Sequence, residues 1–252
     1  MPLQRSEAWT YYTECYLPRV CYPLTASYLI SKQLTKVQMK AMSIIIPGCG
    51  YNYNTHRAII YGPQQIGGAG FRHLNVEQGV LQVAFFLRHI REKSQLGQLF
   101  RCIISWLQLS IGVSFSVFAS PQVILPHMEA KWLAPMHNFL AEQNLSIQLD
   151  HGGVPLIQQE NDSYIMDFIL ASNHYSPAEI RRLNYCRIYL NVVTISDLTM
   201  PDGVNINKSV RDCCPDIQSS RTAILGIIQE RPSGNKWRLW RRVYLLWSNT
   251  NG

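Results

Sequence analysis

The sequence predicts a mainly α-helical protein made of two apposed helical subdomains with short β-hairpins. Apolar residues recur at spacings of three and four over most of the chain, which is the period of a helix with one buried face. Capping residues precede several of these segments. An uncharged stretch that contains Pro121 and Pro126 indicates a boundary near residue 125. We therefore expect one domain at residues 1–125 and a second at residues 126–252.

The first two helices are predicted from their caps and stops. Ser6 begins a helix that reaches Cys15 and is stopped by Pro18. Ser31 caps a second helix that ends before Pro47-Gly48, where the apolar periodicity also ends.

Two longer helices follow, one starting at Asn75 and one at Ser94. Each shows one apolar stripe at helical spacing, which is typical of a face that packs into the core. The stripes are Val76, Val80, Val83, Leu87 and Ile90 in the first helix, and Leu96, Leu99, Ile103, Leu107 and Ile111 in the second.

Residues 57–74, between the helix that begins at Ser31 and the helix that begins at Asn75, form a glycine-rich corner. Strand-like residues at 59–61 are ended by Gly62-Pro63, and the glycines then allow backbone conformations that side chains would block. The turn glycines are Gly62, Gly67, Gly68 and Gly70. The corner lacks the lysine and hydroxyl of a mononucleotide loop and the dinucleotide fingerprint, although its amides could meet a polynucleotide phosphate.

The second half begins with a helix over Met128–Gln143, which Pro135 should kink, and a short strand at Ser146–Leu149. Asp162 can cap a helix that runs through Ala171.

The strongest local signal is Ser176-Pro-Ala-Glu179, a capping box with proline at the first helical position. Two short strands around a turn predict a small hairpin near residues 195–206. After Ser233 a basic aromatic helix is expected, with Trp237, Trp240, Tyr244 and Trp247 on one stripe.

The positive charge is concentrated in the first half. Residues 1–125 contain 11 Lys and Arg against 4 Asp and Glu, whereas residues 126–252 contain 12 of each. A basic half-chain suits a polyanionic partner, although solubilising surface charge explains it equally well. The candidate phosphate contacts are Lys32, Lys36, Lys40, Arg57, Arg72, Arg238, Arg241 and Arg242.

Neither a catalytic centre nor a metal site is predicted. The histidines do not form ligand pairs, no Gly-x-Ser-x-Gly elbow occurs, and the carboxylates do not cluster as two-metal chemistry requires. The seven cysteines lack Cys-x-x-Cys spacing, and the adjacent Cys213 and Cys214 have no nearby histidine. We expect no cofactor and no small-molecule ligand for this chain.

An intracellular location without a membrane span is expected. Met1–Glu7 shows no apolar signal-peptide region, and Cys102 and Cys186 fall within apolar helical patterns that suit reduced, buried thiols. Cys102–Phe118 is strongly apolar, but polar residues interrupt it and its length is near the lower limit for a span. We expect a buried helix there.

Several blocks in order resemble the region just downstream of the polymerase domain in reverse transcriptases of eukaryotic retrotransposons, of the kind abundant in diatoms and other microbial eukaryotes. The resemblance extends from about residue 8 to 247. The blocks are Cys21–Leu24, Arg57–Leu74, Glu77–Gly79, Leu87–Arg91, Lys131–Trp132, Ser176–Leu190, Thr194–Leu198 and Trp237–Arg242.

This resemblance implies a thumb-like helical region that holds an RNA–DNA or DNA duplex by its backbone. The polymerase domain, which uses magnesium, would lie upstream of Met1, and a ribonuclease H-like domain, where present, downstream of Gly252. The catalytic Tyr-x-Asp-Asp motif is absent, so we expect this chain to be inactive alone. The alternatives are an interaction or structural module that packs on a polymerase domain and a decayed, inactive element remnant.

Overall fold

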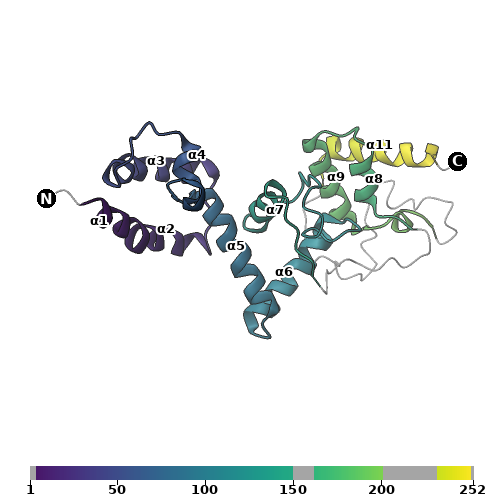
Figure 1. Cartoon of the computed structure of the whole chain (residues 1–252). Coiled ribbons are helices and arrows are strands. Elements are labelled where there is room, and N and C mark those ends of the chain that lie inside the picture. The colour runs from purple at the N-terminus through teal and green to yellow at the C-terminus, as the bar shows by residue number, and fades with distance from the viewer. Residues whose placement is uncertain (1–3, 150–161, 201–231, 251–252) are drawn as a thin grey trace. The chain divides into compact units, whose positions relative to one another are not determined.

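The computed structural model describes residues 4–149, 162–200 and 232–250, the last seven by backbone alone. The mainly helical prediction is confirmed (Figure 1). In the described residues the β-pairing consists of one isolated antiparallel bridge between Tyr164 and Thr194. The predicted hairpin near 195–206 is not seen in its described part, which forms the 3₁₀ turn η3 (Ser196–Leu198), and residues 201–206 lie outside the described residues.

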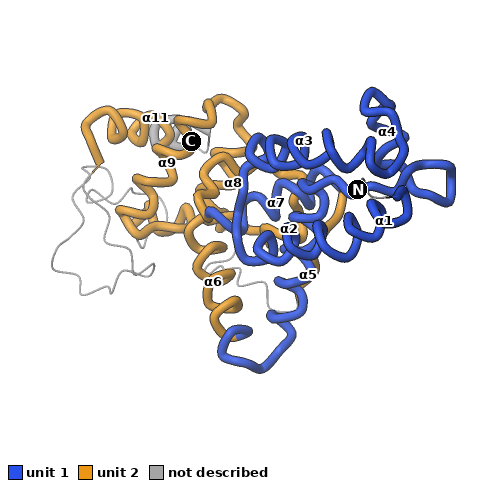
Figure 2. The backbone as a smooth tube through the Cα atoms, turned by 90° about the vertical axis from the view of Figure 1, so that its left-hand side faces the viewer, with its two compact units in different colours: residues 1–97, 131–143 blue, residues 98–130, 144–252 orange. Residues whose placement is uncertain are grey.

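The chain divides into two compact units (Figure 2). The first unit is residues 1–97 with 131–143, and the second is residues 98–130 with 144–252. The two domains expected at 1–125 and 126–252 stay a prediction. The first unit holds α1 (Arg5–Thr10), η1 (Tyr11–Tyr16), α2 (Leu17–Leu24), α3 (Ser31–Gly48), α4 (Arg57–Tyr61), η2 (Gln64–Ile66), α5 (Leu74–Arg91) and α7 (Leu133–Glu142). The second holds most of α6 (Gln95–Ile111) with α8 (Ile165–Ala171), α9 (Pro177–Leu190), η3 and α11 (Gly234–Thr250).

The first helix does not stop at Pro18. Helical backbone continues from α1 through the π-helical turn η1 into α2, and Pro18 lies in the first turn of α2. The Leu17 amide donates to the Tyr12 carbonyl, five residues earlier. A proline ring clashes with the carbonyl four residues before it in a regular α-helix. The wider π turn just before Pro18 relieves that conflict, so the helical path continues past the proline.

The predicted strand at 59–61 is wrong, because these residues form the end of α4. The His56 imidazole accepts a hydrogen bond from the Ala58 amide at 3.3 Å and caps this short helix. The carbonyls of Ile59 and Ile60 accept hydrogen bonds from Ala69 and Phe71, which fixes the corner against α4.

The buried face of α5 differs from the predicted stripe. Val76 and Val80 are 41% and 50% exposed, whereas Gln78 and Gln82 are buried. Both glutamines bond the backbone of the α2–α3 connection: Gln78 exchanges two hydrogen bonds with Leu29, and Gln82 donates to the Ser27 carbonyl. These glutamines are buried because their amide groups satisfy backbone groups of the connection.

A similar shift occurs in α6. Leu96, Leu99 and Ile103 are exposed, while Phe100 and Ile104 are buried together with the predicted Leu107 and Ile111. Ser94 begins this helix as predicted, since its hydroxyl accepts from the Gly97 amide at 3.2 Å.

Gln38 in α3 is buried in the first unit, and its side chain makes three hydrogen bonds. Its Nε2 donates to the Tyr61 hydroxyl and to the Arg72 carbonyl, both at 3.0 Å, and its Oε1 accepts from the Leu74 amide at 3.1 Å. One buried side chain therefore joins α3, α4 and the start of α5 through the corner.

Replacing Gln38 by leucine is expected to lower the free energy of unfolding by about 2 kcal/mol, because buried backbone groups at 72 and 74 lose their partners. Urea denaturation followed by circular dichroism measures the change. Gln98→Leu, at an exposed position of α6, is the matched control and should stay within about 0.5 kcal/mol of wild type. Equal stability of the two variants would contradict the role given to Gln38.

In the second unit the predicted capping box is confirmed. Ser176 Oγ accepts from the Glu179 amide, the Glu179 carboxylate accepts from the Ser176 amide at 2.9 Å, and Pro177 is the first residue of α9. Two other local predictions are wrong: residues 146–149 form no strand, and Asp162 does not cap α8, which begins after Tyr164. The Asp162 carboxylate instead accepts from Ser163 and Ser196, which ties two loops together.

Candidate nucleic-acid interface

The three predicted lysines of α3 share its outward face. Lys32, Lys36 and Lys40 are all exposed, each two residues before a buried position of the helix and so about 200° away around it. Successive lysines are separated by a rise of about 6 Å along the axis. The helix contains no Asp or Glu, and the ion pairs found among the described residues do not involve these lysines. Their charge is unneutralised within the described chain.

Arg57 is held differently. It is the first residue of α4 and half-buried, and its guanidinium lies over the Tyr53 ring with 5.4 Å between its central carbon and the ring centroid. One terminal nitrogen, Nη1, is buried without a hydrogen-bond partner among the described residues. A cation in this setting is fixed in place and still has a donor to give.

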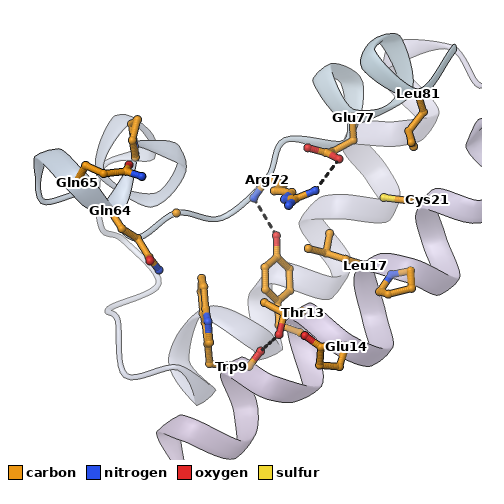
Figure 3. A pocket seen from close by; sticks show the side chains of 14 residues that line it. Trp9, Thr13, Glu14, Leu17, Cys21, Gln64, Gln65, Arg72, Glu77 and Leu81 are labelled. Carbon is orange, nitrogen blue, oxygen red and sulfur yellow. Dashed lines mark hydrogen bonds and ion pairs between the residues drawn. The ribbon is translucent and has the colours of Figure 1, made fainter. Parts of the chain in front are cut away.

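Arg72 lies at the other end of the corner, on the wall of a pocket of about 550 Å³ (Figure 3). Its Nη1 pairs with the Glu77 carboxylate at 3.2 Å, and its side chain is 61% exposed. The Glu14 carboxylate also borders this pocket. A phosphate at Arg72 would have to share the guanidinium with Glu77, so Arg72 is less available to a backbone than the α3 lysines.

The opposite wall of this pocket comes from α1, η1 and α2, and sequence reasoning did not predict the pocket. Trp9 and Tyr12 line it, and the Tyr12 hydroxyl accepts from the Arg72 amide at 2.8 Å (Figure 3). Burial raises the pKa of Tyr12 to about 12. Local signals in the sequence do not indicate this pocket, because Tyr12 and Arg72 meet across 60 positions of the chain.

The glycine corner does not present its amides to a ligand. Every amide from Ile66 to Phe71 donates to a carbonyl between 59 and 64, and the Arg72 amide donates to Tyr12. The suggestion that these amides meet a polynucleotide phosphate is therefore wrong, because their hydrogens are already used. Gly67 and Gly70 have φ of +85° and +74°, and a Cβ at Gly68 would collide with the Gly62 carbonyl.

The remaining predicted contacts lie in the second unit, on α11. Trp237 and Trp240 are buried, and α11 packs against α9 (Figure 1). Arg238, Arg241 and Arg242 are exposed, so the described part of the aromatic stripe faces the protein and the arginines face solvent. The side chains of Tyr244 and Trp247 lie outside the described residues.

The structure thus joins three of the eight predicted contacts on one helix face, places Arg57 and Arg72 at the two ends of the corner, and puts three arginines on a separate unit. In the described ranges no group of three or more His, Cys, Asp or Glu is placed to hold a metal ion. Cys213 and Cys214 lie outside those ranges. No helix in the described part of the chain is long and apolar enough to cross a membrane.

Comparisons with protein-family models, curated proteins and solved structures found no match to this chain.

Proposed function

We propose that this chain binds the phosphate backbone of a nucleic-acid duplex through the outward face of α3, as a non-catalytic part of a retroelement reverse transcriptase. The observation that carries the proposal is the row of three exposed, unpaired lysines on an 18-residue helix without acidic residues. The ordered blocks that resemble the region downstream of a polymerase domain support the same context.

The spacing of the row suits a polyanionic strand. A rise of about 6 Å between lysines is close to the axial rise of about 7 Å over two phosphates of one strand. Lysine recognises phosphate as a point charge, so the contact is independent of sequence and depends on salt. RNA–DNA hybrid and DNA duplex would both be bound.

A second candidate is a module that docks on a protein, such as the upstream polymerase domain. The same helix exposes Val37, Met39 and Ile44, the last at 76%. Apolar side chains among lysines are equally compatible with a protein partner. The experiment below separates the two functions.

Changing Lys32, Lys36 and Lys40 to Glu is expected to abolish binding of the full chain to an RNA–DNA hybrid at 50 mM salt. Fluorescence anisotropy over a range of salt concentrations measures it, and changing the three lysines to Gln should reduce the log–log salt slope by about 3. The matched control changes Arg19, Arg91 and Lys93, three exposed cations of the same unit, to Glu.

The control should retain most of the binding, and circular dichroism should show equal helicity in all variants. If wild type does not bind, or binds without salt dependence, the backbone-binding proposal is wrong. If the control loses as much binding as the α3 variant, general charge and not this face is responsible. Unchanged binding in the α3 variant would favour the docking module for this helix.

A further inference from the structure

A second cavity, of about 290 Å³, lies within the second unit where α6 and α9 approach the loop around residue 127. Trp106, Leu107 and Ile188 supply an apolar wall. This cavity is independent of the α3 face, and its ligand does not depend on the nucleic-acid proposal.

The cavity is bordered by a histidine with one free ring nitrogen. His127 is 4% exposed, and its Nε2 lies 3.1 Å from the Ile111 carbonyl oxygen. Because a carbonyl only accepts, Nε2 carries the hydrogen and Nδ1 is a lone-pair acceptor. Nδ1 is buried and has no hydrogen-bond partner among the described residues. Burial, with the nearby charge of Arg187, lowers the pKa of His127 to about 4, so the ring is neutral at pH 7.

Two donors border the same cavity. Arg181 is exposed, and its Nε donates to the Pro126 carbonyl at 2.8 Å, which leaves its terminal nitrogens for a ligand. Asn184 uses its Oδ1 to accept from Arg187, which directs its amide nitrogen away from that bond. The exposed Glu129 carboxylate also borders the cavity. The site therefore combines a cationic fork, an amide donor, a buried acceptor and an apolar wall.

We propose that this cavity binds a small carboxylate that also carries a hydroxyl or amino group and an apolar tail. The carboxylate lies against Arg181, whose planar fork matches two carboxylate oxygens, with the Asn184 amide beside it. The hydroxyl or amino hydrogen donates to His127 Nδ1. The tail packs on the wall formed by Trp106 and Ile188, and an amino group could also meet Glu129. Sequence reasoning predicts no small-molecule ligand, because these residues are up to 82 positions apart along the chain.

The test uses the full chain and four probes in isothermal titration calorimetry at pH 7. Leucic acid (the hydroxy analogue of leucine) and leucine carry every required group. Isocaproate lacks the hydroxyl, and the alcohol in which methyl replaces the carboxylate of leucic acid lacks the charge. We expect leucic acid or leucine to bind at least about tenfold more tightly than the last two. Isocaproate leaves the buried His127 acceptor unsatisfied, and the alcohol cannot form charge-assisted hydrogen bonds with Arg181.

Two variants test the roles proposed for Arg181 and His127. Arg181→Gln should weaken binding of leucic acid by about tenfold or more, while Arg182→Gln, an exposed neighbour on the same helix, should not. His127→Phe should make leucic acid and isocaproate equal; if it does not fold by circular dichroism, the Arg181 and Arg182 pair decides. The proposal is overturned if no probe binds, if isocaproate binds wild type as well as leucic acid does, or if Arg181→Gln behaves like Arg182→Gln.

Discussion

Replacing Arg187 by methionine is expected to lower the free energy of unfolding by about 4 kcal/mol, the largest effect we predict for a single side chain of the second unit. Arg187 is fully buried, and no carboxylate pairs with it among the described residues. Its guanidinium donates to the carbonyls of Leu109 and Ser110 at 2.9 and 2.6 Å, to Val192 at 3.3 Å, and to Asn184 Oδ1 at 2.9 Å.

These acceptors explain why the charge is tolerated. The last carbonyls of a helix have no partner within the helix and form the negative end of its dipole. Arg187 supplies hydrogen bonds and positive charge there for α6, and it also bonds the loop after α9. Burial lowers the pKa of Arg187 to about 10, which leaves it charged at pH 7. Methionine fills a similar volume but donates nothing, so four acceptors lose their partner.

Denaturant unfolding measures the stability, and hydrogen exchange locates the loss. Peptides covering 98–112 and 177–193 should lose protection in Arg187→Met, while a peptide covering 31–48 in the first unit should not. Arg182→Met, exposed on the same helix, is the matched control and should change stability by less than about 0.5 kcal/mol. A loss below about 1 kcal/mol in Arg187→Met would show that water or relaxed backbone replaces the guanidinium.

Substituting Gly68 by alanine is expected to lower the free energy of unfolding by about 3 kcal/mol, because the new Cβ would collide with the backbone of Gly62. The two backbones lie this close because the Gly70 amide donates to the Gly62 carbonyl at 2.9 Å and the Gly68 amide donates to the Pro63 carbonyl at 2.9 Å. A backbone atom cannot rotate away as a flexible side chain can. The corner must therefore open and lose some of these hydrogen bonds.

Gly67→Ala is the matched control, one residue earlier in the same corner. Its φ is +85°, and a Cβ there would meet nothing within 4 Å. It should cost only about 1 kcal/mol, the penalty of left-handed backbone for alanine. Thermal unfolding by circular dichroism compares the two variants. A larger loss of stability in Gly67→Ala than in Gly68→Ala would contradict the collision. It would show that the corner requires glycine only for its left-handed backbone conformation.

Local signals in the sequence predicted most helix positions. The capping box at Ser176 and the start of α6 after Ser94 follow from groups three residues apart, so no distant contact is needed to form them. Two local signals did not hold in the folded chain. Pro18 did not end the first helix, because a π turn accommodated it, and residues 59–61 became helical against the corner.

Only part of the candidate interface could be predicted from the sequence. Lysines every four residues on a helix share a face by geometry alone, so the exposed row on α3 could be read from the chain. The pairing of Arg72 with Glu77 was within reach of the sequence, since only five residues separate them. The hydrogen bonds that occupy the corner amides could not be predicted, because they depend on how the loop closes on α4.

What the sequence determined by itself is the helical content, the strongest cap and the basic face of α3, since each depends on residues within a few positions of one another. The tertiary structure decided which face of α5 is buried, where Arg187 places its charge, and that a cavity forms beside His127. Gln78 meets Leu29 across 49 positions, and Arg187 meets Leu109 across 78. Helical periodicity reports which residues share a face, but the hydrogen bonds that make a polar face the buried one are formed only when distant segments meet.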